Sequence, residues 1–252
     1  MKARLLLLTL LLAGCEEADA PAQTAVPSPN DCTNAATEAA TARCLQPTMP
    51  EAYYVEQALK YFDTLDVEAS PDSIPNYSER SARWEWAPWL LLTGYGKQNM
   101  LDTARSLRRL DPSTVPIRDC RFFPEQPFAR CYISFTYEGG PCPIYEEFVF
   151  NDAGEMTFIE AWSDIDNLRP TSNADRWGED ADFNRLSTRV PGLGKPDGLI
   201  NPASPEMTAA AATDPLLADF ANRSQNFWAT WLNALQTAPD DFFATGCGWN
   251  TP

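Results

Sequence analysis

A β-sheet pattern occupies residues 115–162 of this 252-residue chain. Residues 144–150 and 156–162 each divide into two alternating sets of side chains, and every set contains aromatic or aliphatic members. Successive side chains of a strand point to opposite faces, so a period of two residues indicates extended structure. The predicted strands are Val115–Phe123, Phe128–Tyr137, Pro143–Phe150 and Met156–Trp162. Gly-bearing turns such as 151–154 (NDAG) predict that these strands form an antiparallel meander.

Helical spacing of apolar residues precedes this sheet and returns near the end of the chain. Residues 50–65 and 98–110 each place apolar side chains on one stripe, which predicts two amphipathic helices. Residues 78–92 contain Trp84, Trp86 and Trp89, and we predict a helical piece there with the tryptophans mainly in the core. Asp214 followed by Pro215 is a helix-start signal, so a last helix is predicted over 214–235.

The order of these elements predicts an α+β fold. N-terminal helices would pack on a curved antiparallel sheet, forming a cone over residues 31–165. Residues 163–207 are rich in Pro, Gly, Asn and Asp and show little periodicity. We therefore predict that 166–252 is a loop-rich extension that ends in a helix and packs on the same domain.

The first residues have the pattern of an export signal. Lys2 and Arg4 precede an apolar run, Leu5–Leu12, which is too short to span a bilayer. Residues 12–15 (LAGC) resemble the lipobox of bacterial lipoproteins. That resemblance implies removal of residues 1–14 and acylation of Cys15. It also implies a lipid-anchored protein that faces the periplasm, with the outer membrane preferred. The alternative is an ordinary cleavable signal with an incidental cysteine.

Residues 15–30 are mostly Ala, Pro, Glu and small polar residues, which predicts a disordered tether between the lipid and the domain.

The remaining six cysteines indicate an oxidising compartment. They are Cys32, Cys44, Cys120, Cys131, Cys142 and Cys247. We predict bonds from Cys32 to Cys44 and from Cys120 to Cys131, because the second pair lies in neighbouring predicted strands. Cys142 would then pair with Cys247, although a bond between Cys131 and Cys142 remains an alternative. No CxxC spacing is present, so no metal site is predicted.

Composition excludes several classes of function. The chain has 35 Asp and Glu against 19 Lys and Arg, a formal net charge of −16, which does not suit a nucleic-acid partner. It contains no His, so a Ser-His-Asp triad, a Cys-His dyad and an imidazole zinc site are excluded. No cofactor is predicted.

The predicted helices, followed by the strand–turn–strand of residues 148–162 (FVFNDAGEMTFIEAW), resemble the nuclear transport factor 2-like superfamily, with its SnoaL-like and cystatin-like cones. The resemblance covers roughly residues 50–165. It implies a cone whose interior binds a ligand or, in some members, carries out catalysis without a cofactor.

The sequence supports three functional hypotheses. The first is a lipid-anchored domain that binds a small apolar or amphipathic ligand or an envelope protein. The second is a cofactor-independent isomerase or hydrolase that uses strand carboxylates and a Tyr in the cone. Its candidate catalytic residues are Asp119, Arg121, Tyr132, Tyr145, Glu147 and Glu160; these could equally be solvent-facing or hydrogen-bonded strand residues. The third is a scaffold protein that docks through Trp228 and Trp231 of the last helix.

Overall fold

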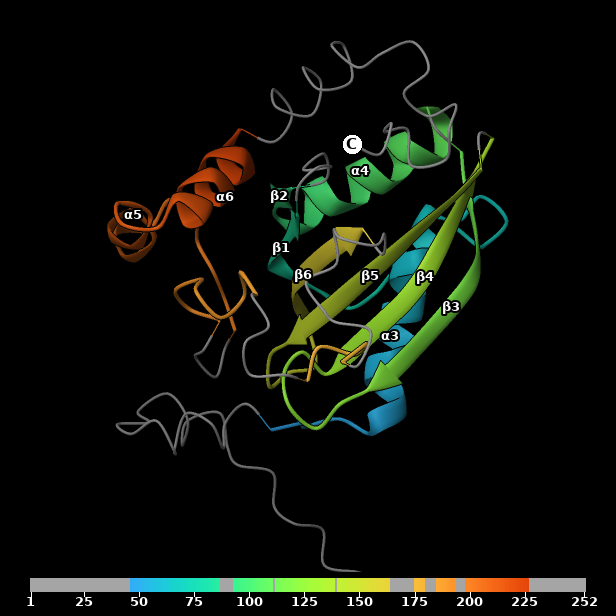
Figure 1. The fold of residues 1–252 in the computed structure, drawn as a ribbon, viewed down its shortest axis with the longest axis horizontal. Coiled ribbons are helices and arrows are strands. Elements are labelled where there is room, and N and C mark those ends of the chain that lie inside the picture. Colours follow the sequence, from blue (N-terminus) through green and yellow to red (C-terminus); the bar gives the residue numbers. More distant parts are fainter. Residues whose placement is uncertain are drawn as a thin grey trace, which may run out of the picture.

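A six-stranded, mixed and curved sheet forms the centre of the fold (Figure 1). The computed structural model describes residues 46–86, 93–110, 112–138, 140–163, 175–179, 185–193 and 198–226. The strands are β1 (Tyr77–Glu85), β2 (Gly94–Tyr95), β3 (Thr114–Phe122), β4 (Ala129–Tyr137), β5 (Gly140–Phe150) and β6 (Met156–Ser163). Their order across the sheet is β2-β1-β6-β5-β4-β3.

The predicted meander is confirmed for the last four strands. β3 pairs with β4, β4 with β5 and β5 with β6, all antiparallel. The expectation of a wholly antiparallel sheet was wrong, because β1 lies beside β6 in parallel. The chain leaves β1, forms the rest of the sheet, and returns as β6 alongside it in the same direction.

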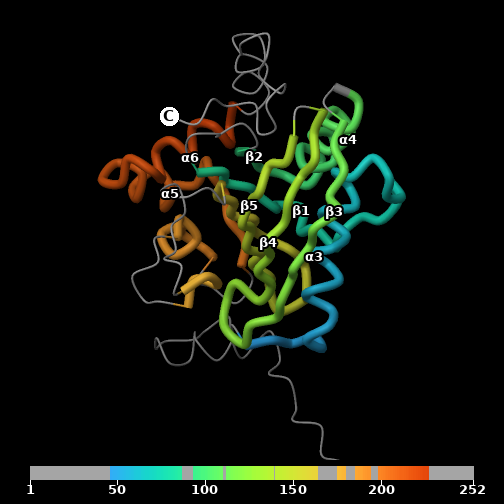
Figure 2. Tube along the Cα trace, turned by 45° about the vertical axis from the view of Figure 1, so that its right-hand side comes forward, coloured from blue at the N-terminus to red at the C-terminus, as the bar shows by residue number. Residues whose placement is uncertain are grey.

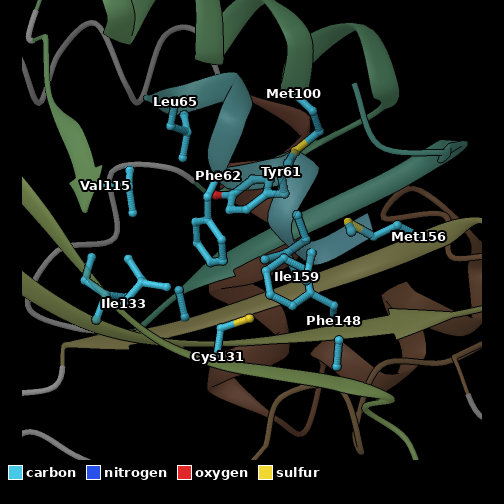
Figure 3. Close-up of a cluster of buried hydrophobic side chains, with 14 of the residues drawn as sticks. Tyr61, Phe62, Leu65, Met100, Val115, Cys131, Ile133, Phe148, Met156 and Ile159 are labelled. Carbon is cyan, nitrogen blue, oxygen red and sulfur yellow. The ribbon is translucent and has the colours of Figure 1, made fainter. Parts of the chain in front are cut away.

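One face of the sheet, here called the inner face, is covered by α3 (Glu51–Leu65) and α4 (Lys97–Leu110) (Figure 1). Both helices agree with the sequence prediction. In α3 the residues at helical spacing, including Tyr54, Ala58 and Phe62, are buried against the sheet. Figure 3 shows this core, with side chains of α3 and Met100 of α4 lying over Ile133, Phe148 and Ile159 of the strands.

The opposite face, here called the outer face, is covered by the described parts of the C-terminal extension. Its core joins Trp84, Val149 and Phe158 of the strands to Leu186 and Phe220 of the extension. Helices α5 (Pro205–Ala211) and α6 (Pro215–Gln225) lie on this side, as Figure 2 shows. Because Phe148 and Phe150 join the inner core while Val149 joins the outer one, both faces of β5 are buried.

The helix predicted over 78–92 was wrong for residues 78–85, and residues 87–92 lie outside the described part of the chain. Residues 77–85 form β1, and the tryptophans Trp84 and Trp86 share its outer face. The inward positions of the strand hold Ser81, Arg83 and Glu85, all of them buried. A β-bulge between Tyr77 and Ala82 also shifts the register against β6. Polar inward residues and a bulge together hide the usual alternation of a strand. Trp89 lies outside the described residues.

The C-terminal helix is shorter than predicted. Asp214 caps α6 by accepting a hydrogen bond from the Leu216 backbone, as expected, with Pro215 in the first turn. The helix ends at Gln225, and Asn226 is its C-cap. Trp228 and Trp231 lie outside the described residues. The short helix α5 was not predicted; it begins within the aperiodic segment 163–207, and Ser204 caps it.

The expected bond between Cys120 and Cys131 is present. The two residues face one another directly across β3 and β4. Cys142 is also disulfide-bonded, so its alternative pairing with Cys131 is excluded. Cys15, Cys32, Cys44 and Cys247 lie outside the described residues, and the other two predicted pairs stay predictions.

Candidate functional site

A buried ion pair lies between the inner face of the sheet and α3. The Nη2 atom of Arg83 in β1 donates to Oε1 of Glu146 in β5 over 3.0 Å. Its Nε atom donates to the hydroxyl of Tyr61 in α3 over 2.9 Å. Arg83 is 2% exposed and Glu146 is 0% exposed. Charged groups are rarely buried this completely without a role, because removing them from water costs several kcal/mol.

The strand register brings these side chains together. Ala161 of β6 pairs with Glu146 on one side and with Glu85 of β1 on the other. The small side chain of Ala161 leaves room for the two carboxyl groups that flank it. Arg83, two positions before Glu85, reaches across β6 to Glu146. The sheet therefore places one guanidinium between two buried carboxylates.

Two atoms of this cluster lack a hydrogen-bond partner. They are Nη1 of Arg83 and Oε2 of Glu146. Oε1 of Glu85 lies 3.6 Å from Nη1 of Arg83, which suits an ion pair but is too far for a hydrogen bond. A buried donor on a charged group that finds no acceptor costs at least ~1–3 kcal/mol. Such a vacancy calls for a water molecule or a ligand.

A cavity opens beside Arg83, between α3, α4 and the β1–β2 edge of the sheet. Its walls include Tyr61, Leu65, Arg83, Met100, Thr103 and Ala104. Leu65, Met100 and Ala104 supply apolar walls, and Asn99 and Thr103 of α4 also line it. The cavity volume is about 10 Å³, close to the space that one water molecule needs. We call it the inner cavity.

Burial sets the ionisation of the cluster. It raises the pKa of Glu146 to about 7, although the positive charge of Arg83 acts in the opposite direction. Burial also raises the pKa of the Tyr61 hydroxyl well above its ordinary value. Glu146 can therefore exchange a proton near neutral pH, while Tyr61 remains a neutral donor and acceptor.

Four of the six residues predicted as catalytic lie on the outer face instead of inside the cone. Glu147 receives two hydrogen bonds from Arg185, at 2.6 and 2.7 Å, and one from the Tyr145 hydroxyl at 2.5 Å. Tyr132 donates to the backbone carbonyl of Arg176. These strand residues hold segments 175–179 and 185–187 of the extension against the sheet.

Glu160 also holds the extension against the sheet. Its carboxylate accepts hydrogen bonds from the indole of Trp86, at 2.8 Å, and from the backbone N–H groups of Leu186 and Ser187. It pairs directly with Glu147 across β5 and β6. Burial, followed by the charge of Glu147, raises the pKa of Glu160 to about 7.

The other two predicted residues form an ion pair near the surface. Arg121 and Asp119 of β3 contact each other over 3.1 Å, and their side chains are 55% and 43% exposed. Arg121 also lies over the ring of Trp177, 4.3 Å from its centroid. Asp119 and Arg121 therefore lie at the surface of the sheet's edge strand and not inside the cone.

Sequence reasoning missed Tyr61, Arg83, Glu85 and Glu146 as site residues. Arg83 and Glu85 fell in the segment read as a helix, and Tyr61 was not singled out within the helix predicted over 50–65. Glu146 alternates with Glu147 in β5, so a period of two already implied that one of these glutamates faces inward.

The described residues contain no helix that is both long and apolar enough to cross a membrane. Within the same ranges, no three His, Cys, Asp or Glu side chains gather into a potential metal site.

No protein-family model matches the sequence, and no curated protein matches it. Solved structures do match. One is a protein of unknown function with a cystatin-like fold from Methylobium petroleophilum PM1, with 17% identity and a TM-score of 0.41 over 50% of this chain and 97% of that one.

A second match is an NTF2-like protein of unknown function from Cytophaga hutchinsonii ATCC 33406, with 14% identity and a TM-score of 0.32 over 43% of this chain and 87% of that one. A third is a proposed isomerase of the SnoaL-like family from Agrobacterium tumefaciens str. C58, with 13% identity and a TM-score of 0.35 over 45% and 99% of the two chains. The structural neighbours of this chain are thus cystatin-like, NTF2-like and SnoaL-like proteins.

Proposed function

We propose that this protein binds a small, mostly apolar molecule in the inner cavity, with Arg83 as the polar anchor. The observation that carries the proposal is that Arg83, whose Nη1 atom has no hydrogen-bond partner, belongs to the residues that line a largely apolar cavity. Ligand pockets typically combine apolar walls with a few fixed polar groups. Tyr61 and Glu146 hold the guanidinium in place, so its free donor is already oriented before a ligand arrives.

The cavity must widen to admit anything larger than water. Met100 of α4 forms part of its wall and is 8% exposed. An unbranched Met side chain adopts several shapes at low energetic cost, so its displacement is the simplest way to make room. The ligand therefore has few heavy atoms, or it enters with one end between α3 and α4.

Filling the cavity should abolish binding. In Ala104→Leu the added atoms project from α4 into the inner cavity, while the Arg83–Glu146 pair stays intact. We expect ligands that stabilise the native protein in a thermal-shift screen to lose that effect in Ala104→Leu.

The matched control is Ala209→Leu, the same substitution at an exposed position of α5, which should behave as the native protein. Equal ligand responses in both variants would place binding elsewhere.

Proton transfer is a second candidate function, favoured by one observation. Glu146 has a pKa of about 7 and shares Arg83 with the Tyr61 hydroxyl, so a base and a neutral donor lie in one buried cluster. Glu146 does not line the inner cavity, so a substrate for this activity has to reach past Arg83 to its carboxyl group. For such an activity we expect Glu146→Gln to stop hydrogen–deuterium exchange at the carbon beside the carbonyl of a bound ketone in D₂O. Exchange that is no faster than in buffer, with the native protein, would leave binding as the function.

We further propose that the domain is anchored to the bacterial envelope through an acylated Cys15, facing the periplasm. The LAGC sequence after a short apolar run supports this, as do the disulfide bonds. We expect Cys15→Ser to move the protein from the membrane fraction to the soluble periplasmic fraction. Mass spectrometry should find lipid on the N-terminal peptide of the native protein alone. An unmodified Cys15 would contradict the anchor.

A further inference from the structure

On the outer face, side chains of the sheet bind three successive backbone carbonyls of the extension, those of residues 176–178. Tyr132 of β4 donates to the first carbonyl. Nη1 of Arg130, also in β4, donates to the second over 2.7 Å and to the third over 3.2 Å. The hydroxyl of Tyr145 in β5 lies 2.9 Å from the second carbonyl. Hydrogen bonds to the main chain give affinity in peptide recognition, whereas pockets for side chains give specificity.

The specificity here comes from Trp177 and Gly178. The indole of Trp177 packs against the rings of Tyr132 and Phe123, with centroid distances of 4.8 and 6.0 Å. Gly178 is buried and has a φ of 65°, a conformation that residues with a side chain rarely adopt. The surface therefore fits an aromatic residue followed by glycine. We call it the Trp–Gly site, formed by Phe123, Arg130, Tyr132 and Tyr145.

The sheet itself holds the main donors of the Trp–Gly site in place. The guanidinium of Arg130 lies over the ring of Phe123, 4.0 Å from its centroid, and its Nε atom donates to the backbone carbonyl of Pro127 over 3.3 Å. Arg130 and Tyr132 are 5% and 4% exposed. Because these contacts involve residues of the sheet and its turns, they do not depend on segment 175–179. A preorganised site binds a polypeptide at a lower entropic cost.

Segment 175–179 is attached differently from the next part of the extension. Leu186, Val190 and Leu193 are buried members of the outer core. Within 175–179, by contrast, only Gly178 is buried, Trp177 is half-buried, and no residue belongs to the inner or outer core. Segments that bury few apolar side chains open locally at a low free-energy cost. This segment can therefore leave the sheet while both cores stay closed.

We infer that the Trp–Gly site binds a polypeptide segment of another protein that presents an aromatic residue followed by glycine. Segment 175–179 is then a tethered competitor, which covers the site until such a partner displaces it. A tethered segment competes at a high effective concentration, so the partner has to bind more tightly than the chain's own segment does. This interaction surface lies on the face of the sheet opposite the inner cavity and is independent of the proposed ligand there.

A peptide probe tests the inference on the full chain. The probe is a fluorescently labelled peptide of residues 173–181 (NADRWGEDA), and binding is followed by fluorescence anisotropy. In Trp177→Ala the chain's own segment loses its anchor, so we expect this variant to bind the peptide at least tenfold more tightly than the native chain does. Peptides that carry Trp177→Ala or Gly178→Val should bind the same variant at least tenfold more weakly than the unchanged peptide.

Two Tyr→Phe substitutions locate the binding site. Tyr132→Phe, added to Trp177→Ala, removes the donor to the first carbonyl, and we expect it to weaken peptide binding at least threefold. The matched control is Tyr95→Phe in the same background. It removes a hydroxyl that donates to another carbonyl of the extension, that of Ile200, over 3.1 Å. Peptide binding should be unchanged in this control.

Several results would overturn the inference. Absent binding to Trp177→Ala, or equal binding to the native chain, would show that the segment does not compete for this site. Equal binding of the three peptides would show that the surface does not select the Trp–Gly pair. Light scattering that finds a dimer of the native chain and a monomer of Trp177→Ala would assign the site to a second copy of this chain instead. If Trp177→Ala does not fold by circular dichroism, Gly178→Val replaces it, because it disfavours the backbone conformation of the same segment.

Discussion

Replacing Arg83 with Met should lower the free energy of unfolding by about 3–5 kcal/mol, one of the largest effects expected from a single substitution in this chain. The change leaves Glu146 buried at 0% exposure without its cation, and Tyr61 loses the donor to its hydroxyl. Met has a similar length and fills most of the space, so the loss reflects charge more than packing. Urea unfolding followed by circular dichroism measures the difference.

A double-mutant cycle identifies the cause. Arg83→Met/Glu146→Met removes both charges, and we expect it to recover a large part of the loss, because a buried pair replaced by apolar residues is often close to neutral. The control is Arg105→Met, which removes an exposed Arg paired with Asp102 and should cost less than about 1 kcal/mol. Additive effects of the two inner substitutions would show that Arg83 and Glu146 do not act as a pair.

Much of the fold was predictable because local patterns agree with tertiary structure there. The strands β3 to β6 and the helices α3 and α4 were located from periodicity together with turn and helix-boundary residues. The pairing of Cys120 with Cys131 followed from adjacent strands. In these elements apolar residues occupy the buried positions, so the sequence reports burial directly.

The candidate site was not predictable, because polar and charged residues occupy its buried positions. β1 buries Ser81, Arg83 and Glu85 on the inner face, so its pattern inverts the usual rule for a half-buried strand. Its partner β6 is distant in sequence and parallel, and no local turn reveals that pairing. A strand that breaks the local rule is where a functional site is expected, because burial of its charges must be compensated elsewhere.

On the outer face, sequence reasoning took residues that bind the extension for candidate catalytic residues. Tyr145, Glu147 and Glu160 have the residue types of an acid–base site, and sequence reasoning placed them in the cone. Each of them instead binds the extension: Tyr145 through the backbone carbonyl of Trp177, Glu147 through Arg185, and Glu160 through the backbone of 186–187. Because both faces of β5 and β6 are buried, alternation separates the faces without telling which one carries the cavity.

The two buried glutamates on opposite faces should make the protein more stable in mild acid than at neutral pH. Burial raises the pKa of Glu146 and of Glu160 to about 7, from an ordinary value of 4.5. The folded state therefore binds these protons more tightly than the unfolded state does. Their contribution is fully present below about pH 4.5 and is lost as the pH rises through 7. Its size is roughly 3 kcal/mol for each residue at most.

Asp66 has the opposite pH dependence, so it limits the gain in stability in stronger acid. Burial opposes its ionisation, but hydrogen bonds from the backbones of Glu68 and Val115 and from Arg118 lower its pKa below 3.8. Its contribution is present above that value and is lost as the pH falls further. Stability should therefore rise from about pH 8 to about pH 5 and decline in stronger acid.

Urea unfolding across this pH range tests the assignment, with Glu146→Gln/Glu160→Gln as the decisive variant. Relief of general charge repulsion in a chain of net charge −16 would also favour mild acid. That contribution persists in the double variant, whereas the contribution of the two buried carboxyl groups disappears. We expect the slope of stability against pH to flatten in the double variant and to stay unchanged in the control Glu125→Gln, which alters an exposed loop residue. If the double variant keeps the native slope, surface charge governs the pH response, and the two glutamates ionise in the folded protein much as they do in the unfolded chain.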